Sequence, residues 1–175
     1  MAADTAGTIF TMLVAAGLLG TIAIRLIGGE VRDELARFSL PLAATVATGA
    51  MAGSLYFSEI ENFTPCELCW YQRIAMYPLA IILIVASLRR DQGIRPYAAV
   101  LAIGGSAISI YHYQLQAFPD QGSSCSTDAP CTFRWIEVFG FVSIPLLALG
   151  SFLIVLVLLS MPTPQSPTVL PQEPS

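Results

Sequence analysis

Two cysteines separated by two residues, Cys66 and Cys69, are the residues of this 175-residue chain best suited to chemistry. The sequence around them reads FTPCELCWYQR, and Arg73 follows Cys69 by one helical turn. On a helix these three side chains share one face. The positive end of a helix favours thiolates at its N-terminus, and a nearby guanidinium adds to that effect. The pattern therefore predicts a reactive pair of thiols.

Local signals place this pair at the beginning of a helix. Thr64 is the predicted N-cap, Pro65 suits the first helical position, and Glu67 completes a capping box. A disulfide between cysteines one helical turn apart closes a very small loop, so it adds little stability and tends to be strained. Strained, exposed disulfides are typical of labile, catalytic sites.

A second pair, Cys125 and Cys131, lies in the long polar segment 116–134. A structural disulfide is one interpretation of this pair. A zinc site shared with the first pair is a poorer one, because five residues that include Pro130 separate the two cysteines, and we predict no metal. The simplest redox chemistry is disulfide exchange between the two pairs, helped by a loop that Gly122 makes able to move. The sequence has no haem, flavin or nucleotide motif, so a lipid-soluble electron acceptor fits best.

Arg73 and His112 are the candidate residues for holding that acceptor. An arginine one turn inside an apolar helix either extends to the lipid headgroups or finds a partner, and a quinone carbonyl beside Cys69 would be such a partner. His112 is the only histidine and lies near the end of an apolar run, at a similar depth. It is either a polar tip in water or a second contact to the quinone ring.

The composition is that of a membrane protein. The chain is 55% hydrophobic and 11% charged, and it has no basic stripe that would indicate a nucleic-acid partner. Five apolar runs are long enough to be helices that cross a bilayer. They are residues 6–24, 40–57, 70–88, 97–115 and 138–161. We therefore predict an all-α integral membrane protein.

The first run, 6–24, is either a signal peptide or a retained membrane helix. No arginine precedes it, and no small-residue cleavage motif closes it, so a retained helix is the better interpretation. We accordingly predict an extra N-terminal transmembrane helix within residues 1–28, a four-helix membrane domain over 39–161 and a disordered tail over 162–175. The tail assignment rests on its proline, glutamine and serine content.

Arginine placement predicts the orientation. Six of the eight arginines lie at two connectors on one side, which the positive-inside rule makes cytoplasmic. They are Arg25, Arg32, Arg37, Arg89, Arg90 and Arg95. Both cysteine pairs then lie on or beside the opposite face, which is oxidising in bacteria.

The segment 66–73 resembles the signature of the disulfide bond formation protein B (DsbB) family, in particular its BdbC-like branch. Residues 111–116, 131–135, 139–141 and 144–145 are similar to further segments of that family, and the resemblance covers about 40–159. It implies a four-helix bundle in the bacterial cytoplasmic (inner) membrane, with both cysteine pairs on the extracytoplasmic side. It also implies that the protein oxidises a thioredoxin-fold thiol oxidase (DsbA/BdbD-like) and reduces ubiquinone or menaquinone.

The resemblance also implies a role for each cysteine. Cys125 would be attacked by the partner, Cys131 would relay to Cys66, and Cys69 would contact the quinone with help from Arg73. Two features depart from the family. The second cysteine pair lies within one short loop, and the run 6–24 is an addition to the four helices.

Two alternatives remain open. A vitamin K epoxide reductase-like enzyme shares the bundle and the chemistry, but its quinone-facing cysteine pair comes after the loop pair. A membrane protein with two static disulfides would have no catalytic role. The sequence does not set the direction of electron flow, because that depends on the potentials of partner and quinone.

Overall fold

The computed structural model describes residues 2–27, 36–121, 125–126 and 129–162. Within these residues the long helices are α1 (Ala2–Ile27), α3 (Ser39–Leu55), α4 (Glu67–Arg89), α5 (Arg95–Ala117) and α6 (Ile144–Leu159). The π-helical turn η1 (Tyr56–Ile60) continues α3, and the 3₁₀ turns are η2 (Gln92–Ile94) and η3 (Pro119–Gln121). The predicted tail and the segment 28–35 lie outside the described residues.

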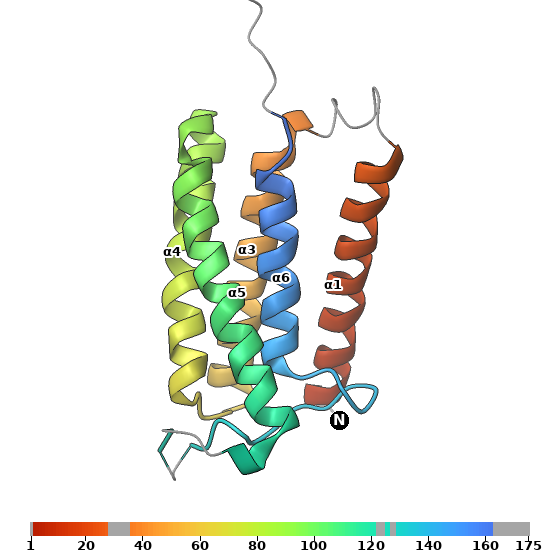
Figure 1. The fold of residues 1–175 in the computed structure, drawn as a ribbon, viewed down its shortest axis with the longest axis vertical. Helices are drawn as coiled ribbons and strands as arrows, with labels where there is room; N and C mark the ends of the chain where they lie inside the picture. Colours follow the sequence, from red (N-terminus) through yellow and green to blue (C-terminus); the bar gives the residue numbers. More distant parts are fainter. Residues whose placement is uncertain (1, 28–35, 122–124, 127–128, 163–175) are drawn as a thin grey trace, which may run out of the picture.

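Helices α3 to α6 form a four-helix bundle. Each helix packs mainly against its two neighbours in the cyclic order α3, α4, α5, α6. The diagonal helices α4 and α6 make few contacts with each other. Helix α1 stands outside this bundle and packs along α6 (Figure 1). The predicted four-helix bundle with an added N-terminal helix is therefore confirmed.

Among the residues that the structure describes, four helical segments are long and apolar enough to cross a membrane. They are Ala3–Ile24, Ser39–Ile60, Glu67–Arg89 and Gln92–Ala117, and the apolar helix Ile144–Leu159 is shorter. The protein is thus a multi-pass membrane protein, in which the backbone polar groups of each span are satisfied within its own helix.

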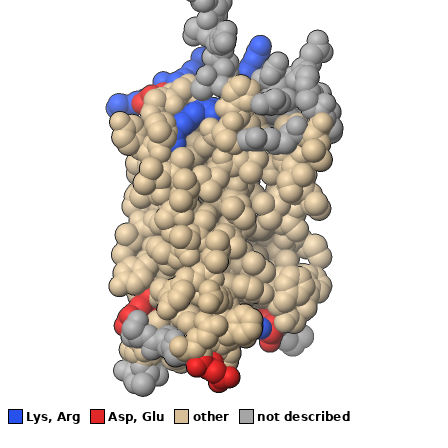
Figure 2. Space-filling model, viewed as in Figure 1, with Lys and Arg blue, Asp and Glu red and all other residues tan. Residues whose placement is uncertain are grey.

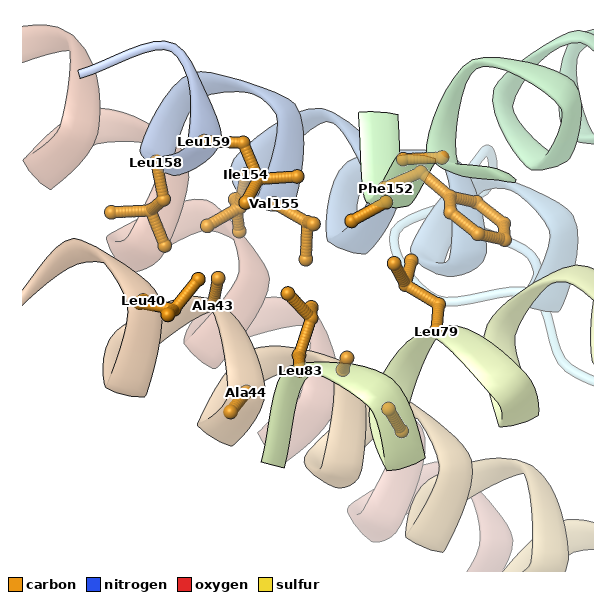
Figure 3. Packing of buried hydrophobic residues seen from close by; sticks show 14 of the residues in the cluster. Leu40, Ala43, Ala44, Leu79, Leu83, Phe152, Ile154, Val155, Leu158 and Leu159 are labelled. Carbon is orange, nitrogen blue, oxygen red and sulfur yellow. The ribbon is translucent and has the colours of Figure 1, made fainter. Parts of the chain in front are cut away.

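The core of the bundle is made of alanines and branched aliphatic residues. Leu40 and Ala43 of α3, Leu79 and Leu83 of α4 and Val155 of α6 all point into this core (Figure 3). All five side chains are almost fully buried. Small residues at these contacts let the helix backbones approach closely, which is how helices gain packing energy in a membrane.

The last apolar run begins its helix later than its hydropathy predicts. The sequence predicts a run from Val138, but α6 starts at Ile144, and Val138 and Val142 instead pair through two backbone hydrogen bonds of 2.9 Å. Between them Phe139 and Gly140 have positive φ angles of 55° and 78°. The prediction was wrong here because apolarity does not distinguish a tight turn from a helix.

The predicted loop 58–65 also begins later, because η1 keeps the chain helical to Ile60. This wider turn holds Phe57 in the interior, where its ring stacks on Phe63 with centroids 5.9 Å apart. π-helical turns occur often at functional sites, and this one leads directly into the segment that precedes the first cysteine pair.

The two ends of the bundle differ in charge. In Figure 2, arginine side chains gather at the end where α4 meets α5, and acidic side chains gather at the opposite end. The first end carries Arg89, Arg90 and Arg95, whereas Glu59 and Glu61 lie at the end that holds the cysteines.

Candidate active site

The first cysteine itself caps the helix that carries the pair. Helix α4 begins at Glu67, its N-cap is Cys66, and the Cys66 sulfur accepts the backbone N–H of Cys69 at 3.4 Å. The prediction of Thr64 as N-cap was therefore wrong. A sulfur took the position that a hydroxyl usually fills. The thiol consequently lies directly at the positive helix end, which stabilises its thiolate.

Cys66 and Cys69 are free thiols whose sulfur atoms lie 3.0 Å apart. Hydrogen bonds from the Cys69 thiol, from His112 and from the backbone N–H of Cys69 together lower the pKa of Cys66 from 9.0 to about 4. The bond from the Cys69 thiol has the largest effect, and burial opposes all three. In the reduced pair Cys66 is therefore the sulfur that carries the negative charge.

His112 lies between the two cysteine pairs. It is 1% exposed, and its Nε2 is 3.1 Å from the carbonyl oxygen of Cys131 and 3.5 Å from the sulfur of Cys66. Its Nδ1 is 3.3 Å from the side-chain amide nitrogen of Gln72. Since an amide nitrogen donates and a carbonyl accepts, this network fits an imidazole with its proton on Nε2. His112 then donates toward both Cys131 and Cys66.

The second pair forms a disulfide that is docked onto the first pair. Cys125 and Cys131 are bonded to each other, and Cys131 is 0% exposed. Cys131 packs in one buried cluster with Cys66 and Leu115, while Cys125 is only partly buried at its edge. The sequence predicts a loop that could present both cysteines to a partner, but the fold leaves only Cys125 within reach of the outside.

A large cavity lies on the other side of the first pair. Its volume is about 100 Å³, and Cys69 forms part of its wall whereas Cys66 does not. Its wall is mostly apolar, and its polar side chains are those of Gln72, Arg73 and a few hydroxyl residues. An apolar lining with a few polar groups is typical of a site for a small organic ligand.

Arg73 is folded against α3 at the wall of this cavity. Its Nε donates to the Ser54 hydroxyl at 2.9 Å and its guanidinium to the Ser54 carbonyl at 3.0 Å. The guanidinium carbon also lies 5.2 Å from the centre of the Trp70 ring. Arg73 therefore shares the cavity wall with Cys69.

The six predicted site residues meet in one place and are divided between the two sides of the first cysteine pair. Cys69 and Arg73 line the cavity, whereas His112 lies behind Cys69, in a much smaller pocket with Cys66. Cys131 lies on the Cys66 side. Whether His112 contacts a quinone stays a prediction.

One group of side chains in the described residues is close enough to hold a metal ion. The ligand atoms of Cys66, Cys69 and His112 all lie within 4.8 Å of one another. A four-cysteine zinc site would need Cys125 and Cys131 as thiolates, and here they are joined in a disulfide.

Sequence reasoning did not identify Gln72, Ser54 or Phe10 as site residues. Gln72 directly precedes Arg73, and its polar side chain within an apolar helix was a signal that could have been used. Ser54 and Phe10 resemble the many other serine and phenylalanine residues of the apolar runs, so the sequence does not single them out. Their role comes from contacts between helices.

The comparison with known proteins agrees with this site. The sequence model of the family "Disulfide bond formation protein DsbB" matches residues 36–161. Disulfide bond formation protein C of Bacillus subtilis is 48% identical over 114 residues, which are 64% of this chain and 83% of that protein. A probable disulfide formation protein C 1 of Bacillus cereus is 46% identical over 133 residues, which are 74% of this chain and 93% of that protein.

No solved structure matches the chain. The family match covers all four helices of the bundle, both cysteine pairs, Arg73 and His112, and it leaves α1 outside. The extent of this match, together with a pair of free thiols beside a buried disulfide, shows that the chain belongs to the disulfide bond formation protein DsbB family.

Proposed function

We propose that this protein is a thiol:quinone oxidoreductase that reoxidises a thioredoxin-fold disulfide oxidase (DsbA/BdbD-like) and passes the electrons to ubiquinone or menaquinone. The observation that carries the proposal is the position of the first cysteine pair. Cys66 packs against the buried Cys131, while Cys69 lines the large cavity on the other side. The pair therefore lies between a disulfide that can receive electrons and a space for an acceptor.

The first step takes electrons from the partner. A partner thiolate attacks Cys125, the more exposed sulfur, and the bond to Cys131 breaks. The second thiol of the partner then resolves the mixed disulfide. The partner leaves with a disulfide, and Cys125 and Cys131 are left as a dithiol that has gained two electrons and two protons.

The second step moves these electrons to the first pair. Cys131 attacks Cys66 of an oxidised Cys66–Cys69 pair and displaces Cys69 toward the cavity. Cys125 then attacks Cys131 and displaces Cys66, which re-forms the Cys125–Cys131 disulfide. The lowered pKa of Cys66 favours this release, because a thiol of low pKa is the better leaving group.

The cavity fits a quinone ring by the chemistry of its wall. Arg73 is a donor that can face a quinone carbonyl, and the thiol of Cys69 shares the wall with it. When bound there, a quinone supplies a sink for two electrons and two protons as the Cys66–Cys69 disulfide re-forms. In this proposal His112 acts mainly on Cys66, because it contacts that sulfur and does not line the large cavity.

The proposal includes a location and a division of the chain. The membrane is the bacterial cytoplasmic membrane, and both cysteine pairs face its extracytoplasmic side, as the arginine-rich opposite end supports. Residues 39–161 form the catalytic domain, and residues 1–28 form an added transmembrane helix.

The test is quinone-dependent oxidation of a reduced thioredoxin-fold partner by the purified protein. We expect Cys69→Ser to abolish turnover and Arg73→Ala to raise the KM for quinone, with Arg89→Ala as a matched control at the opposite end. Full quinone-dependent turnover by Cys69→Ser would contradict the mechanism. Static disulfides would give no thiol oxidation by any variant, and net partner reduction by added quinol would show the opposite direction.

A further inference from the structure

The wall of the cavity includes a helix that lies outside the family match. Phe10 and Val14 of α1 line the same cavity as Cys69 and Arg73. The family match begins at residue 36, so these side chains belong to the part that the family does not share.

Close packing fixes α1 at this position. A Cβ atom added at Gly150 of α6 would lie 2.3 Å from Val14, and one added at Gly17 of α1 would lie 2.8 Å from Ile154 of α6. A side chain at Gly150 would clash with the short, branched Val14, and a side chain at Gly17 would force the end of Ile154 to shift. The helix is packed against α6 at two levels, and its cavity-lining side chains have a fixed place.

Phe10 reaches past α6 to α3. Its ring lies on Gly53, where an added Cβ would be 2.9 Å from two ring carbons. Gly53 directly precedes Ser54, the residue that accepts both hydrogen bonds from Arg73. The ring of Phe10 is thus placed next to the anchoring point of the guanidinium.

Phe10 is also the first member of a row of aromatic rings along the cavity wall. Its ring centre lies 5.9 Å from that of Phe57, Phe57 stacks on Phe63 at 5.9 Å, and Phe63 stacks on Trp135 at 4.9 Å. All four rings line the cavity. Aromatic faces of this kind bind a flat ring by offset or edge contacts.

We infer that α1 completes the quinone site. Phe10 and Val14 form the part of the cavity wall that the four-helix bundle does not supply, and they contact the bound ring there. This inference rests on the proposed function, because it concerns the acceptor of the same reaction. Phe10 acts as a specificity-determining residue for the acceptor, and the exchange reactions among the four cysteines do not depend on it.

The test uses the full-length purified protein and decylubiquinone, a short-chain quinone. Binding is followed without turnover by quenching of the tryptophan fluorescence, since the chain has only two tryptophans and Trp135 lines the cavity. We expect Phe10→Ala to raise the Kd and the KM for the quinone about tenfold, or about 1.4 kcal/mol. Single-turnover oxidation of reduced partner without quinone should stay unchanged. Leu13→Ala is the matched control, because Leu13 is 63% exposed on the same helix.

A second pair of variants moves Phe10 without removing it. Gly53→Ala should displace the ring and raise the Kd, whereas Gly49→Ala should not, because its added Cβ meets nothing within 4 Å. A photoreactive azidoquinone should label the peptide that contains Phe10 in the unaltered protein. This experiment does not depend on the folding of any variant.

The outcomes separate the two proposals. Normal binding by Phe10→Ala and Gly53→Ala, together with labelling confined to α3, α4 and α6, would overturn the role of α1 alone. Failure of the parent protein to bind or reduce any quinone would overturn the proposed function and this inference with it.

Discussion

His112 contributes to the negative charge on Cys66 through a contact that spans 46 positions in sequence. Its Nε2 donates toward the Cys66 sulfur and toward the Cys131 carbonyl, so it contacts one cysteine of each pair. Because hydrogen bonds to the charged form lower the pKa of a thiol, His112 helps to keep Cys66 ionised at neutral pH.

Removal of His112 should raise the pKa of Cys66. Only the thiolate is alkylated, so the pH profile of iodoacetamide labelling of Cys66 in the reduced protein, followed by mass spectrometry, reports this pKa. We expect a midpoint below about pH 7 for the parent protein and a shift to higher pH for His112→Ala. Tyr113→Phe, a neighbour that bonds Phe141 instead, should leave the profile unchanged.

The same pKa shift makes the stability of the reduced protein depend on pH. The folded pKa of Cys66 is lowered, so its contribution is present above the unfolded pKa near 9 and declines as the pH falls toward about 4. This contribution exists only for the reduced pair, so it also makes the Cys66–Cys69 disulfide a stronger oxidant. An alkylation profile that His112→Ala leaves unmoved would contradict the role of His112. A midpoint near pH 9 in the parent protein would contradict the pH dependence of stability.

At the scale of the helices, α5 and α6 meet through a glycine. A Cβ added at Gly105 would lie 2.2 Å from the ring of Phe152, whereas one at Gly104 would meet nothing within 4 Å. The Phe152 ring fills the space that Gly105 leaves, and it also lines the cavity. The packing of α5 on α6 and the shape of the cavity therefore both depend on the absence of a side chain at Gly105.

Gly105→Ala should destabilise the protein by overpacking, by about 1–3 kcal/mol. Gly104→Ala is the matched control, and it should be neutral or slightly stabilising because alanine favours a helix more than glycine does. The measurement is the unfolding free energy in detergent micelles. Equal changes in unfolding free energy for the two substitutions would show that the helix propensity of alanine, and not the contact with Phe152, determines the stability.

At the other end of the bundle, Arg95 joins three helices. It donates to the carbonyls of Leu159 and Met161 at 2.9 and 2.8 Å and to the Ser39 hydroxyl at 2.7 Å. Arg95→Met removes these bonds and leaves buried acceptors unpaired, so we expect a loss of about 2–4 kcal/mol in unfolding free energy. Arg89 is exposed, so Arg89→Ala should change the unfolding free energy little. An equal loss from both substitutions would show that the lost positive charge, and not the hydrogen bonds of Arg95, causes the effect.

At the scale of the whole molecule, the separation of charge predicts the orientation in the membrane. Cysteine placed at Arg90 should react with a membrane-impermeant maleimide only after the cells are permeabilised, in a variant whose four native cysteines are serine. Cysteine placed at Glu59, at the opposite end, should react in intact cells. Labelling of position 90 in intact cells would reverse the proposed orientation.

Local patterns in the sequence determined the class of the protein and the candidate cysteines of its site. Long apolar runs identify membrane helices because the bilayer requires about 20 apolar residues, and a two-residue spacing predicts a reactive cysteine pair. The resemblance around Cys66 and Arg73 also identified the family that the comparison then showed. These signals lie within short segments, so they need no knowledge of the fold.

The tertiary structure alone decided how those segments meet. Helices α3, α4 and α6 are apolar on nearly every face, so in them no periodic pattern shows which side chains point inward. The contact of His112 with Cys66, the burial of Cys131 and the arrival of Phe10 at the cavity depend on helix packing between distant segments. Such packing is fixed by the shapes of facing side chains, as at Gly53 and Gly150, and these shapes match only once the helices are assembled.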